Sequence, residues 1–456
     1  MRMLESGDSV GLLARLENVP FSRWHAKARI IVGSATFFDA FNALSLAFAL
    51  PVLIRLWNIT PTESGFLIGA SYVGQLIGAL LFSWLAEKFG RIPSATAAVA
   101  LMSLMSLGCA LAGDFRALLV FRIVQGIGVG GEMPVAAAYI SELSRAKGRG
   151  RFFMLYEMIF PVGLMATSQI GAWIVPVSGW KAMFLIGGVP GLVITFLLAR
   201  LPESPRWLIS QGRLHEAELI VKQIEAAAGH KASAASEMAT PSTSLSTPGQ
   251  AERGRWREVL APSFRGRTFV VWTLWAAAYF VTNSLNNWMP SLYNTVYHLG
   301  LKESLRAASM TNAAQVVLLL ICAFCIDRIG RRNWTIASFM VGGAALAILG
   351  FTGAHSVLSV MILATFSYGV LGSVNAVLYL YTPEIYPTRM RAIGTGLATS
   401  WLRLASAVGP PLVGVMVAAG GIGSVFIVFA GTCLIGALAA VFMIETRARR
   451  LEEIAK

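Results

Sequence analysis

The sequence predicts an all-α, polytopic membrane protein with twelve transmembrane helices in two pseudo-symmetric six-helix halves. The first reason is composition: 56% of the 456 residues are hydrophobic and 13% are charged, about half the charged fraction of soluble domains. The second is that apolar segments long enough to cross about 30 Å of hydrocarbon recur along the whole chain. The spans are expected at residues 28–54, 63–86, 93–112, 117–140, 152–175, 182–201, 268–290, 305–326, 334–353, 357–381, 393–418 and 422–444.

These spans divide the chain into five parts. The expected parts are a cytoplasmic N-terminal segment (1–27), an N-terminal six-helix bundle (28–201), a cytoplasmic linker (202–267), a C-terminal six-helix bundle (268–444) and a cytoplasmic C-terminal tail (445–456). Within the linker, RLHEAELIVKQIEAAA has helical periodicity. The later run ASAASEMATPSTSLSTPGQ is of low complexity, and we expect it to be disordered.

Lys and Arg are concentrated in the loops on one side of the predicted spans, which makes that side and both termini cytoplasmic. The net charge of +14 follows from this asymmetry and favours contact with anionic lipids. Nucleic-acid binding is a poor alternative, because the basic residues are scattered among short loops. The N-terminus has no apolar h-region before a cleavage site, so the first span is expected to act as an uncleaved insertion signal. The four cysteines all fall inside predicted spans and indicate neither disulfides nor a metal site.

Three short motifs occur once in each half, at matching positions. WLAEKFGR (84–91) corresponds to CIDRIGRR (325–332), YISELSRAKGRG (139–150) to YTPEIYPTRMRA (381–392), and LPESPRWL (201–208) to IETRARRLEEI (444–454). Two parallel six-helix halves are a transporter plan in which the substrate binds at the midplane, between the halves.

At these motifs the sequence resembles the major facilitator superfamily over nearly its full length. PESPRWL and the YTPEIYPT–RxR run are typical of its sugar-porter, organic-ion and synaptic-vesicle-glycoprotein branches. GIGVGGEMPVAAAYISE, FFDAFN, LYEMIFPVG and NWMPS are similar to the bacterial niacin permeases and related metabolite:proton symporters. The resemblance implies a secondary transporter of the bacterial inner membrane that works by alternating access, without a cofactor, as a monomer.

Acidic and basic residues lie together at the predicted cytoplasmic helix ends and are candidates for gating ion pairs. Inter-helix pairs there could form and break as the transporter changes state; the alternative is that they only anchor the topology. The first copy of the motif has Glu87, Lys88 and Ile92 where the family has Asp, Arg and Arg, which would weaken its latch. The candidate gating residues are Glu87, Arg91, Glu142, Arg149, Asp327, Arg331, Glu384 and Arg391.

Five charged residues lie well inside predicted spans: Asp39, Arg122, Glu132, Glu157 and Arg403. A charge at that depth costs at least ~2.5 kcal/mol, so each is expected to be functional or paired. In the superfamily, helices 1 and 4 line the cavity from the N half, and the resemblance therefore places Asp39 within reach of Arg122. Loss of that partner would favour protonation of Asp39, so the pair would act as a proton switch; a static ion pair is the alternative.

The first helix departs from the niacin permeases at one position. Those proteins usually carry two acids spaced D-x-x-D, whereas here Asn42 follows Asp39. Asn42 can hydrogen-bond a substrate but cannot carry a proton. Coupling therefore rests on Asp39 alone, is shared by Glu132 or Glu157, or is lost in a uniporter. Glu132 and Glu157 could instead pair with the cytoplasmic arginines.

Arg403 is the candidate for binding a substrate carboxylate, since Arg matches a planar carboxylate with two hydrogen bonds and no acid is visible in the C-half spans. Pairing with an N-half acid such as Glu157 is the alternative. Aromatic and amide side chains that could hold a flat ligand surround it in the predicted fold, although each aromatic alone is also explained by packing. They are Tyr279, Asn283, Asn286, Asn287, Trp288, Gln315, Tyr368, Asn375, Tyr379 and Trp401.

The expected function is proton-coupled uptake of a small organic anion, with an aromatic monocarboxylate such as nicotinate as the expected substrate. A sugar, polyol or organic-cation symporter or uniporter is the alternative within transport, and a non-transporting membrane sensor is the distant one. An enzyme is not expected, because no Ser–His–acid set, metal-ligand spacing or nucleotide loop lies near a span. The G-x-G-x-x-G of Gly126, Gly128 and Gly131 falls inside a span, where small residues permit close helix packing.

Overall fold

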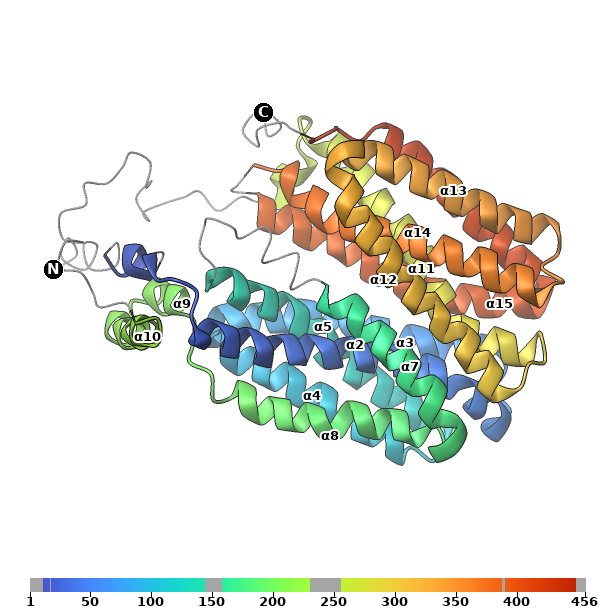
Figure 1. The fold of residues 1–456 in the computed structure, drawn as a ribbon, viewed down its shortest axis with the longest axis horizontal. Helices are drawn as coiled ribbons and strands as arrows, with labels where there is room; N and C mark the ends of the chain where they lie inside the picture. The colour runs from blue at the N-terminus through green and yellow to red at the C-terminus, as the bar shows by residue number, and fades with distance from the viewer. Residues whose placement is uncertain (1–10, 17, 144–157, 230–255, 388–389, 448–456) are drawn as a thin grey trace.

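The computed structural model describes residues 11–16, 18–143, 158–229, 256–387 and 390–447 (Figure 1). Within them the chain is helical and has no β-strand, which confirms the predicted fold class. Arg149, Glu157 and the low-complexity part of the linker lie outside the described residues. The helices of the N half are α2 (Arg23–Trp57), α3 (Pro61–Phe89), α4 (Arg91–Leu111), α5 (Phe115–Glu142), α7 (Ile159–Ser178) and α8 (Lys181–Leu198).

The C half follows the same plan. Its helices are α11 (Arg265–Thr295), α12 (Leu301–Ile329), α13 (Arg331–Phe351), α14 (Val357–Glu384) and α15 (Arg391–Val441). Eleven described helices are long and apolar enough to cross a membrane. The last of them, α15, has 51 residues and is interrupted at Gly421, whose φ of 73° is non-helical. Gly421 lies between the predicted spans 393–418 and 422–444, so α15 contains both of them.

Two short helices, α9 (Pro205–Ser210) and α10 (Leu214–Ala227), follow α8, and the 3-10 helix η2 (Trp256–Leu260) precedes α11. The linker helix expected at 213–228 is α10. Residues of the N-terminal segment pack against it, and Arg15 donates hydrogen bonds of 2.9 and 2.7 Å to the carboxylate of Glu225. This contact raises the pKa of Arg15 and ties the start of the chain to the linker.

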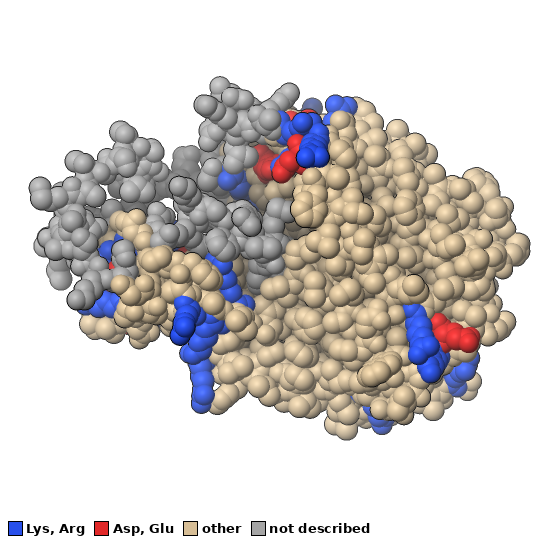
Figure 2. All heavy atoms as spheres, in the orientation of Figure 1, with Lys and Arg blue, Asp and Glu red and all other residues tan. Residues whose placement is uncertain are grey.

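The outer surface matches a lipid environment. Figure 2 shows Lys, Arg, Asp and Glu gathered toward the two ends of the molecule, with a broad uncharged band between them. Large apolar side chains are exposed on the candidate membrane-spanning helices, such as Trp173 (77% exposed) and Phe324 (81%). In water such a surface would favour aggregation, whereas in a bilayer it faces hydrocarbon.

One end of each half carries the repeated sequence motifs, and we call it the motif end. In the N half, Gly90 adopts a φ of 109° between α3 and α4, a conformation that favours glycine. The Glu203 carboxylate then accepts hydrogen bonds from the main-chain N–H groups of Arg91 (3.0 Å) and Ile92 (3.2 Å). Burial raises the pKa of Glu203, and these N–H donors oppose that shift. Glu203 therefore caps the start of α4.

The C half repeats this arrangement. Gly330 has a φ of 92°, and the Glu445 carboxylate accepts hydrogen bonds from the main-chain N–H groups of Arg331 and Arg332, both at 3.1 Å. Glu203 of LPESPRWL and Glu445 of IETRARRLEEI thus correspond in structure as well as in sequence. In each half, the chain after the sixth helix caps the third.

The two halves contact each other closely toward the opposite end, which carries the turns at Asn58 and Gly421. Along the contact between α3 and α15, a Cβ added at Gly65 would lie 2.5 Å from the main-chain oxygen of Pro410. One added at Gly69 would lie 2.7 Å from the main-chain oxygen of Ala407. Such glycines let two helix backbones approach closely, so this end of the contact between the halves is closed.

Candidate substrate and proton site

Asp39 lies on α2, in the membrane-spanning part of the N half. Its side chain is 2% exposed, and within the described residues Oδ1 has no hydrogen-bond partner. The charged groups that interact with it electrostatically are Glu132 of α5 and Arg403 of α15. Asp39 thus faces a like charge from its own half and an opposite charge from the other half.

Arg122 lies on α5 and is 1% exposed. Its Nη1 donates hydrogen bonds to the main-chain oxygen of Asn42 (3.0 Å) and to Oε1 of Gln125 (2.7 Å). Gln125 in turn donates to Oδ1 of Asn42 (2.9 Å). Among the described contacts there is no pair between Arg122 and Asp39, so the expected ion pair is not the arrangement seen. Arg122 instead contacts Asn42, which occupies the position of the second acid in the D-x-x-D pattern of the niacin permeases.

Asn42 was expected to contact substrate, but it is packed inside the N half and is 0% exposed. Besides its bond from Gln125, its Nδ2 donates to the main-chain oxygens of Phe38 (2.8 Å) and Gly187 of α8 (3.3 Å). The side chain therefore joins α2, α5 and α8. Gln125 was missed by the sequence analysis; the available signal was a polar residue three positions after Arg122, on the same helix face.

Glu132 lies on α5 and is 1% exposed. Its Oε1 accepts a hydrogen bond from Oγ1 of Thr36 on α2, at 2.9 Å. Thr36 precedes Asp39 by three residues and so lies on the same face of α2. Glu132 therefore belongs to the surroundings of Asp39, whereas Glu157 falls outside the described residues.

Arg403 is the charged residue of α15 that was expected to bind substrate. Its Nη1 donates to the main-chain oxygen of Thr399 in the same helix (3.2 Å), and within the described residues its Nε has no hydrogen-bond partner. Its electrostatic neighbours are Tyr379, Asp39 and Tyr279. The guanidinium therefore lies where residues of both halves meet, with hydrogen-bonding capacity left over.

Aromatic rings lie beside Arg403. Trp275 stacks on Tyr279 with ring centroids 5.5 Å apart and meets Tyr379 edge-on at 4.7 Å. Trp401, by contrast, packs against Trp272 with a centroid distance of 5.5 Å. Residues two apart on an α-helix point roughly 200° away from each other, so Trp401 is on another face of α15 than Arg403. The structure groups Tyr279 and Tyr379 with the arginine and separates Trp401 from it.

The amide side chains of α11 contact several helices. Nδ2 of Asn287 donates to the hydroxyl of Tyr72 on α3 (3.1 Å), a contact between the halves. Oδ1 of Asn286 accepts from Nδ2 of Asn312 on α12 (2.9 Å), and Asn283 donates to the hydroxyl of Ser406 on α15. These amides therefore connect the α-helices around the interface instead of standing unpaired.

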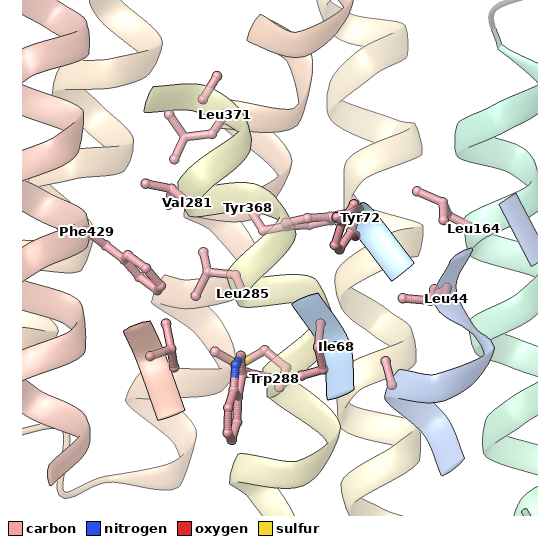
Figure 3. Close-up of a cluster of buried hydrophobic side chains, with 14 of the residues drawn as sticks. Leu44, Ile68, Tyr72, Leu164, Val281, Leu285, Trp288, Tyr368, Leu371 and Phe429 are labelled. Carbon is pink, nitrogen blue, oxygen red and sulfur yellow. The ribbon is translucent and has the colours of Figure 1, made fainter. Parts of the chain in front are cut away.

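Tyr368 of α14 extends this polar network. Its hydroxyl donates to Oε1 of Gln315 (2.9 Å) and contacts Oδ1 of Asn312 (3.3 Å). Figure 3 shows the Tyr368 side chain pointing from the C half toward Tyr72 of the N half. Tyr72 and Asn312 were missed by the sequence analysis, because nothing in the sequence indicates which helix faces meet between the halves.

The remaining two candidates of the C half, Asn375 and Trp288, each donate a hydrogen bond to a neighbouring helix of the same half. Nδ2 of Asn375 donates to Oγ1 of Thr282 (3.1 Å), and within the described residues Oδ1 of Asn375 has no hydrogen-bond partner. Trp288 is 3% exposed, and its Nε1 donates to the main-chain oxygen of Pro410 (3.2 Å). Trp288 is therefore a packing residue in this state, whereas Asn375 keeps a free acceptor.

The gating candidates of the N half form a cluster at the motif end. Arg91 contacts Glu142 of α5 at 3.0 Å and Glu87 of α3 at 3.4 Å. The helix α9 holds both acidic residues through their main chain: Arg206 donates to the oxygen of Glu142 (2.9 Å) and Trp207 to that of Glu87 (3.1 Å). The PESPRWL motif thus braces the N-half cluster, a role that the sequence analysis did not assign.

The C-half cluster has the same form. Arg331 contacts Asp327 at 3.0 Å and Glu384 of α14 at 3.7 Å, and Nε of Arg391 donates to the main-chain oxygen of Tyr386 (3.4 Å). Both clusters join helices of a single half in this state. The bond from Arg91 to its α5 acid is shorter than the equivalent C-half contact, so the distances do not show a weaker N-half latch.

Comparison with known proteins gives a consistent picture. The family model described as sugar (and other) transporter matches residues 35–456. The niacin transporter NiaP of Acinetobacter baylyi is 32% identical over 97% of this chain and 99% of its own length. The inner membrane metabolite transport protein YgcS of Escherichia coli is 26% identical, over 92% of each chain.

Solved structures share the fold. The xylose transporter XylE from E. coli in a partially occluded inward open conformation superposes with a TM-score of 0.72 at 20% identity, covering 94% of this chain and all of that chain. A crystal structure of a D-xylose-proton symporter also gives a TM-score of 0.72, at 19% identity, over 95% of this chain and 99% of the other.

Proposed function

Since this chain belongs to the sugar (and other) transporter family of the major facilitator superfamily, we propose that it carries a small organic anion into the cell together with protons. The expected substrate is an aromatic monocarboxylate such as nicotinate. The observation that carries this proposal is a buried carboxyl oxygen of Asp39 in the N half and a buried Nε of Arg403 in the C half, neither with a hydrogen-bond partner among the described residues, in two groups close enough to interact electrostatically. The protein is a multi-pass membrane transporter and not an enzyme.

Arg403 has the properties of a carboxylate receptor. Its Nε lacks a hydrogen-bond partner among the described residues, although a buried donor left unpaired costs free energy. A substrate carboxylate would supply two acceptors in the plane of the guanidinium. Tyr279 and Tyr379 lie beside it and offer ring faces or edges to a flat ligand.

Asp39 has the properties of the proton carrier. Burial and the negative charge of Glu132 disfavour ionised Asp39, and the positive charge of Arg403 opposes them. A substrate carboxylate bound to Arg403 neutralises that charge, and the buried Asp39 is then expected to take up a proton. Anion and proton would therefore load together. This replaces the switch between Asp39 and Arg122 that the sequence suggested, because Arg122 is bonded to Asn42 and Gln125 instead.

Alternating access would then move both ligands. Arg403 and Asp39 belong to different halves, so a rocking motion of the halves changes their surroundings together. The halves contact each other closely at Gly65 and Pro410, toward the end opposite the motif end. With the motif end in the cytoplasm, as the basic loops predict, this state would be the one that releases substrate inward. A monomer contains all of these parts.

The choice of an aromatic acid rests on two supports. A relative that is 32% identical over almost the whole chain is named a niacin transporter. The positive charge of Arg403 favours an anionic substrate. The alternative within transport is a sugar or polyol, favoured by the polar network of Asn286, Asn312 and Gln315. A sugar has no carboxylate to accept from the Nε of Arg403, which is unpaired among the described residues, and an organic cation would be repelled by the guanidinium.

Uptake by the purified protein in liposomes tests the proposal. Uptake of externally added nicotinate, benzoate, xylose and choline is measured with and without an inward proton gradient across the vesicle membrane. We expect an aromatic acid to accumulate only with the gradient. Accumulation of xylose or choline, without uptake of either acid, would contradict the proposed substrate class.

A further inference from the structure

The first membrane-spanning helix, α2, carries only one of the two acids of the D-x-x-D pattern. The structure places another carboxyl group near Asp39. We propose that Glu132 of α5 and Asp39 of α2 form a single proton-binding pair, with Glu132 as the second acid of the site. This inference rests on the proposed proton coupling and names the residue that shares it. It concerns how the proton is held, and it makes no further claim about the substrate.

The geometry brings the two carboxyl groups together from neighbouring helices. Thr36 on α2 donates a hydrogen bond of 2.9 Å to Oε1 of Glu132, which fixes that carboxyl group against α2. Asp39 follows Thr36 by three residues, a spacing that places their Cβ atoms about 5–6 Å apart on one face. Asp39 and Glu132 are 2% and 1% exposed, and they interact electrostatically. They therefore share one water-poor environment.

The other charged and titratable groups around Asp39 are few. Arg403 faces it from α15, and Tyr279 of α11 and Tyr379 of α14 lie beside that guanidinium. Arg122 is on the same helix as Glu132, but it is bonded to Asn42 and Gln125. The described part of α7 contains no ionisable residue, and the only one in α8 is Lys181, at its start. Among the described residues, Asp39 thus meets a positive charge, that of Arg403, across the interface between the halves.

Two carboxylates in a low-dielectric site resist being ionised at the same time, so such a pair titrates as a unit. Oδ1 of Asp39 has no hydrogen-bond partner among the described residues and is the atom positioned to receive a proton. When substrate neutralises Arg403, a proton from the outside water binds there. The hydroxyl of Thr36 favours the negative charge on Glu132. When the site opens inward, the proton leaves to water on that side and the pair regains its original charge.

The position of Asn42 agrees with this assignment. A second acid at that position of α2 would lie beside Arg122, which already donates to the main-chain oxygen of Asn42 and to Oε1 of Gln125. Neutral groups therefore already occupy the space next to Arg122. The second carboxyl group is found instead on α5, beside Thr36, on the part of α2 that lies nearer the motif end.

The test uses the purified full-length protein in liposomes, with uptake of nicotinate measured as a function of external pH. Glu132→Gln removes the neighbouring negative charge, so protonating Asp39 becomes harder and the pH of half-maximal uptake falls by about one unit. Thr36→Val removes the hydroxyl that stabilises ionised Glu132, and the same midpoint rises. Ser34→Ala is the control, because among the described residues this hydroxyl bonds only the main-chain oxygen of Ile30 (2.7 Å); we expect no change.

Opposite shifts in Glu132→Gln and Thr36→Val would support the pair, since a merely structural role would lower the rate without moving the midpoint. Glu132→Asp keeps a carboxyl group and should restore a pH profile close to that of the parent protein, which covers the case of a poorly folded Gln variant. An unchanged midpoint in Glu132→Gln, in a protein whose parent is proton-driven, would overturn the inference alone. If uptake by the parent protein does not depend on the proton gradient, the proposed proton coupling itself is wrong.

Discussion

Arg122 donates a hydrogen bond to the main-chain oxygen of Asn42 at 3.0 Å, and the side chain of Gln125 links the same two residues. A buried guanidinium is thus held by neutral acceptors where an acid was expected to neutralise it. Removing either acceptor would leave buried polar groups unpaired. We therefore interpret this cluster as a structural brace, a set of hydrogen bonds that holds α2 against α5. In the proposed mechanism the switching charges lie elsewhere, on Asp39, Glu132 and Arg403.

The brace can be tested through Gln125. Gln125→Leu leaves Nη1 of Arg122 with one acceptor fewer and Oδ1 of Asn42 without a donor, at a cost of about 1–3 kcal/mol for each unsatisfied group. We expect a clearly lower thermal unfolding midpoint in detergent, measured by intrinsic fluorescence. Gln211→Leu, at an exposed position after α9, is the control. A midpoint equal to that of the control would argue against the brace.

Arg403 should control the affinity for acids. Arg403→Ala removes a charge-assisted contact worth about 1.5–3 kcal/mol, so nicotinate binding is expected to weaken about 10- to 150-fold. Arg403→Lys keeps the charge without the planar fork and should give an intermediate affinity. Isothermal titration of purified protein measures both, with exposed Arg306→Ala as the control. Unchanged acid affinity in Arg403→Ala would remove this residue from the site.

The close contact between the halves should depend on Gly65. Gly65→Ala places a methyl group against the Pro410 carbonyl, where the distance of 2.5 Å is too short for carbon and oxygen. We expect the population to move toward states opened at this end, with wider distances between spin labels on Asn58 and Gly420 and slower transport. Gly431→Ala is the matched control, since nothing lies within 4 Å of its added Cβ. Identical distance distributions for the two variants would refute the role of this contact.

Glu203 should make stability depend on pH. Burial raises its pKa above the value it has in the unfolded chain, so the stability it contributes is present below that unfolded value and is lost as pH rises through the folded one. Glu203→Gln keeps an acceptor for the N–H groups of Arg91 and Ile92 but cannot ionise. Its thermal midpoint should therefore fall less than that of the parent between pH 4.5 and 7. Equal slopes for parent and variant would contradict this.

Much of the fold could be predicted from the sequence, since apolar length and repeated motifs are local properties. The correspondence of Glu203 with Glu445 is one example, because each follows the sixth helix of its half and caps the third. Gly421 is another: it lies between two predicted spans, and its non-helical φ interrupts α15. Short-range patterns were enough in both cases.

The site was harder to predict, because it depends on the relative height and rotation of helices far apart in sequence. Asp39 and Asn42 differ by one turn of α2, and that turn decides which of them meets Arg122. The same limit explains Trp401, which is close to Arg403 in sequence but packs against Trp272 on another side of α15. Tyr72 and Asn312 were missed because their partners belong to other helices.

The central claim is that Asp39 carries the proton that drives uptake, and Asp39→Asn in liposomes tests it most directly. This variant keeps the size of the side chain but cannot ionise. With an imposed proton gradient we expect it to lose concentrative uptake of nicotinate while still exchanging internal for external nicotinate in counterflow. Concentrative uptake at the level of the parent protein would contradict the account.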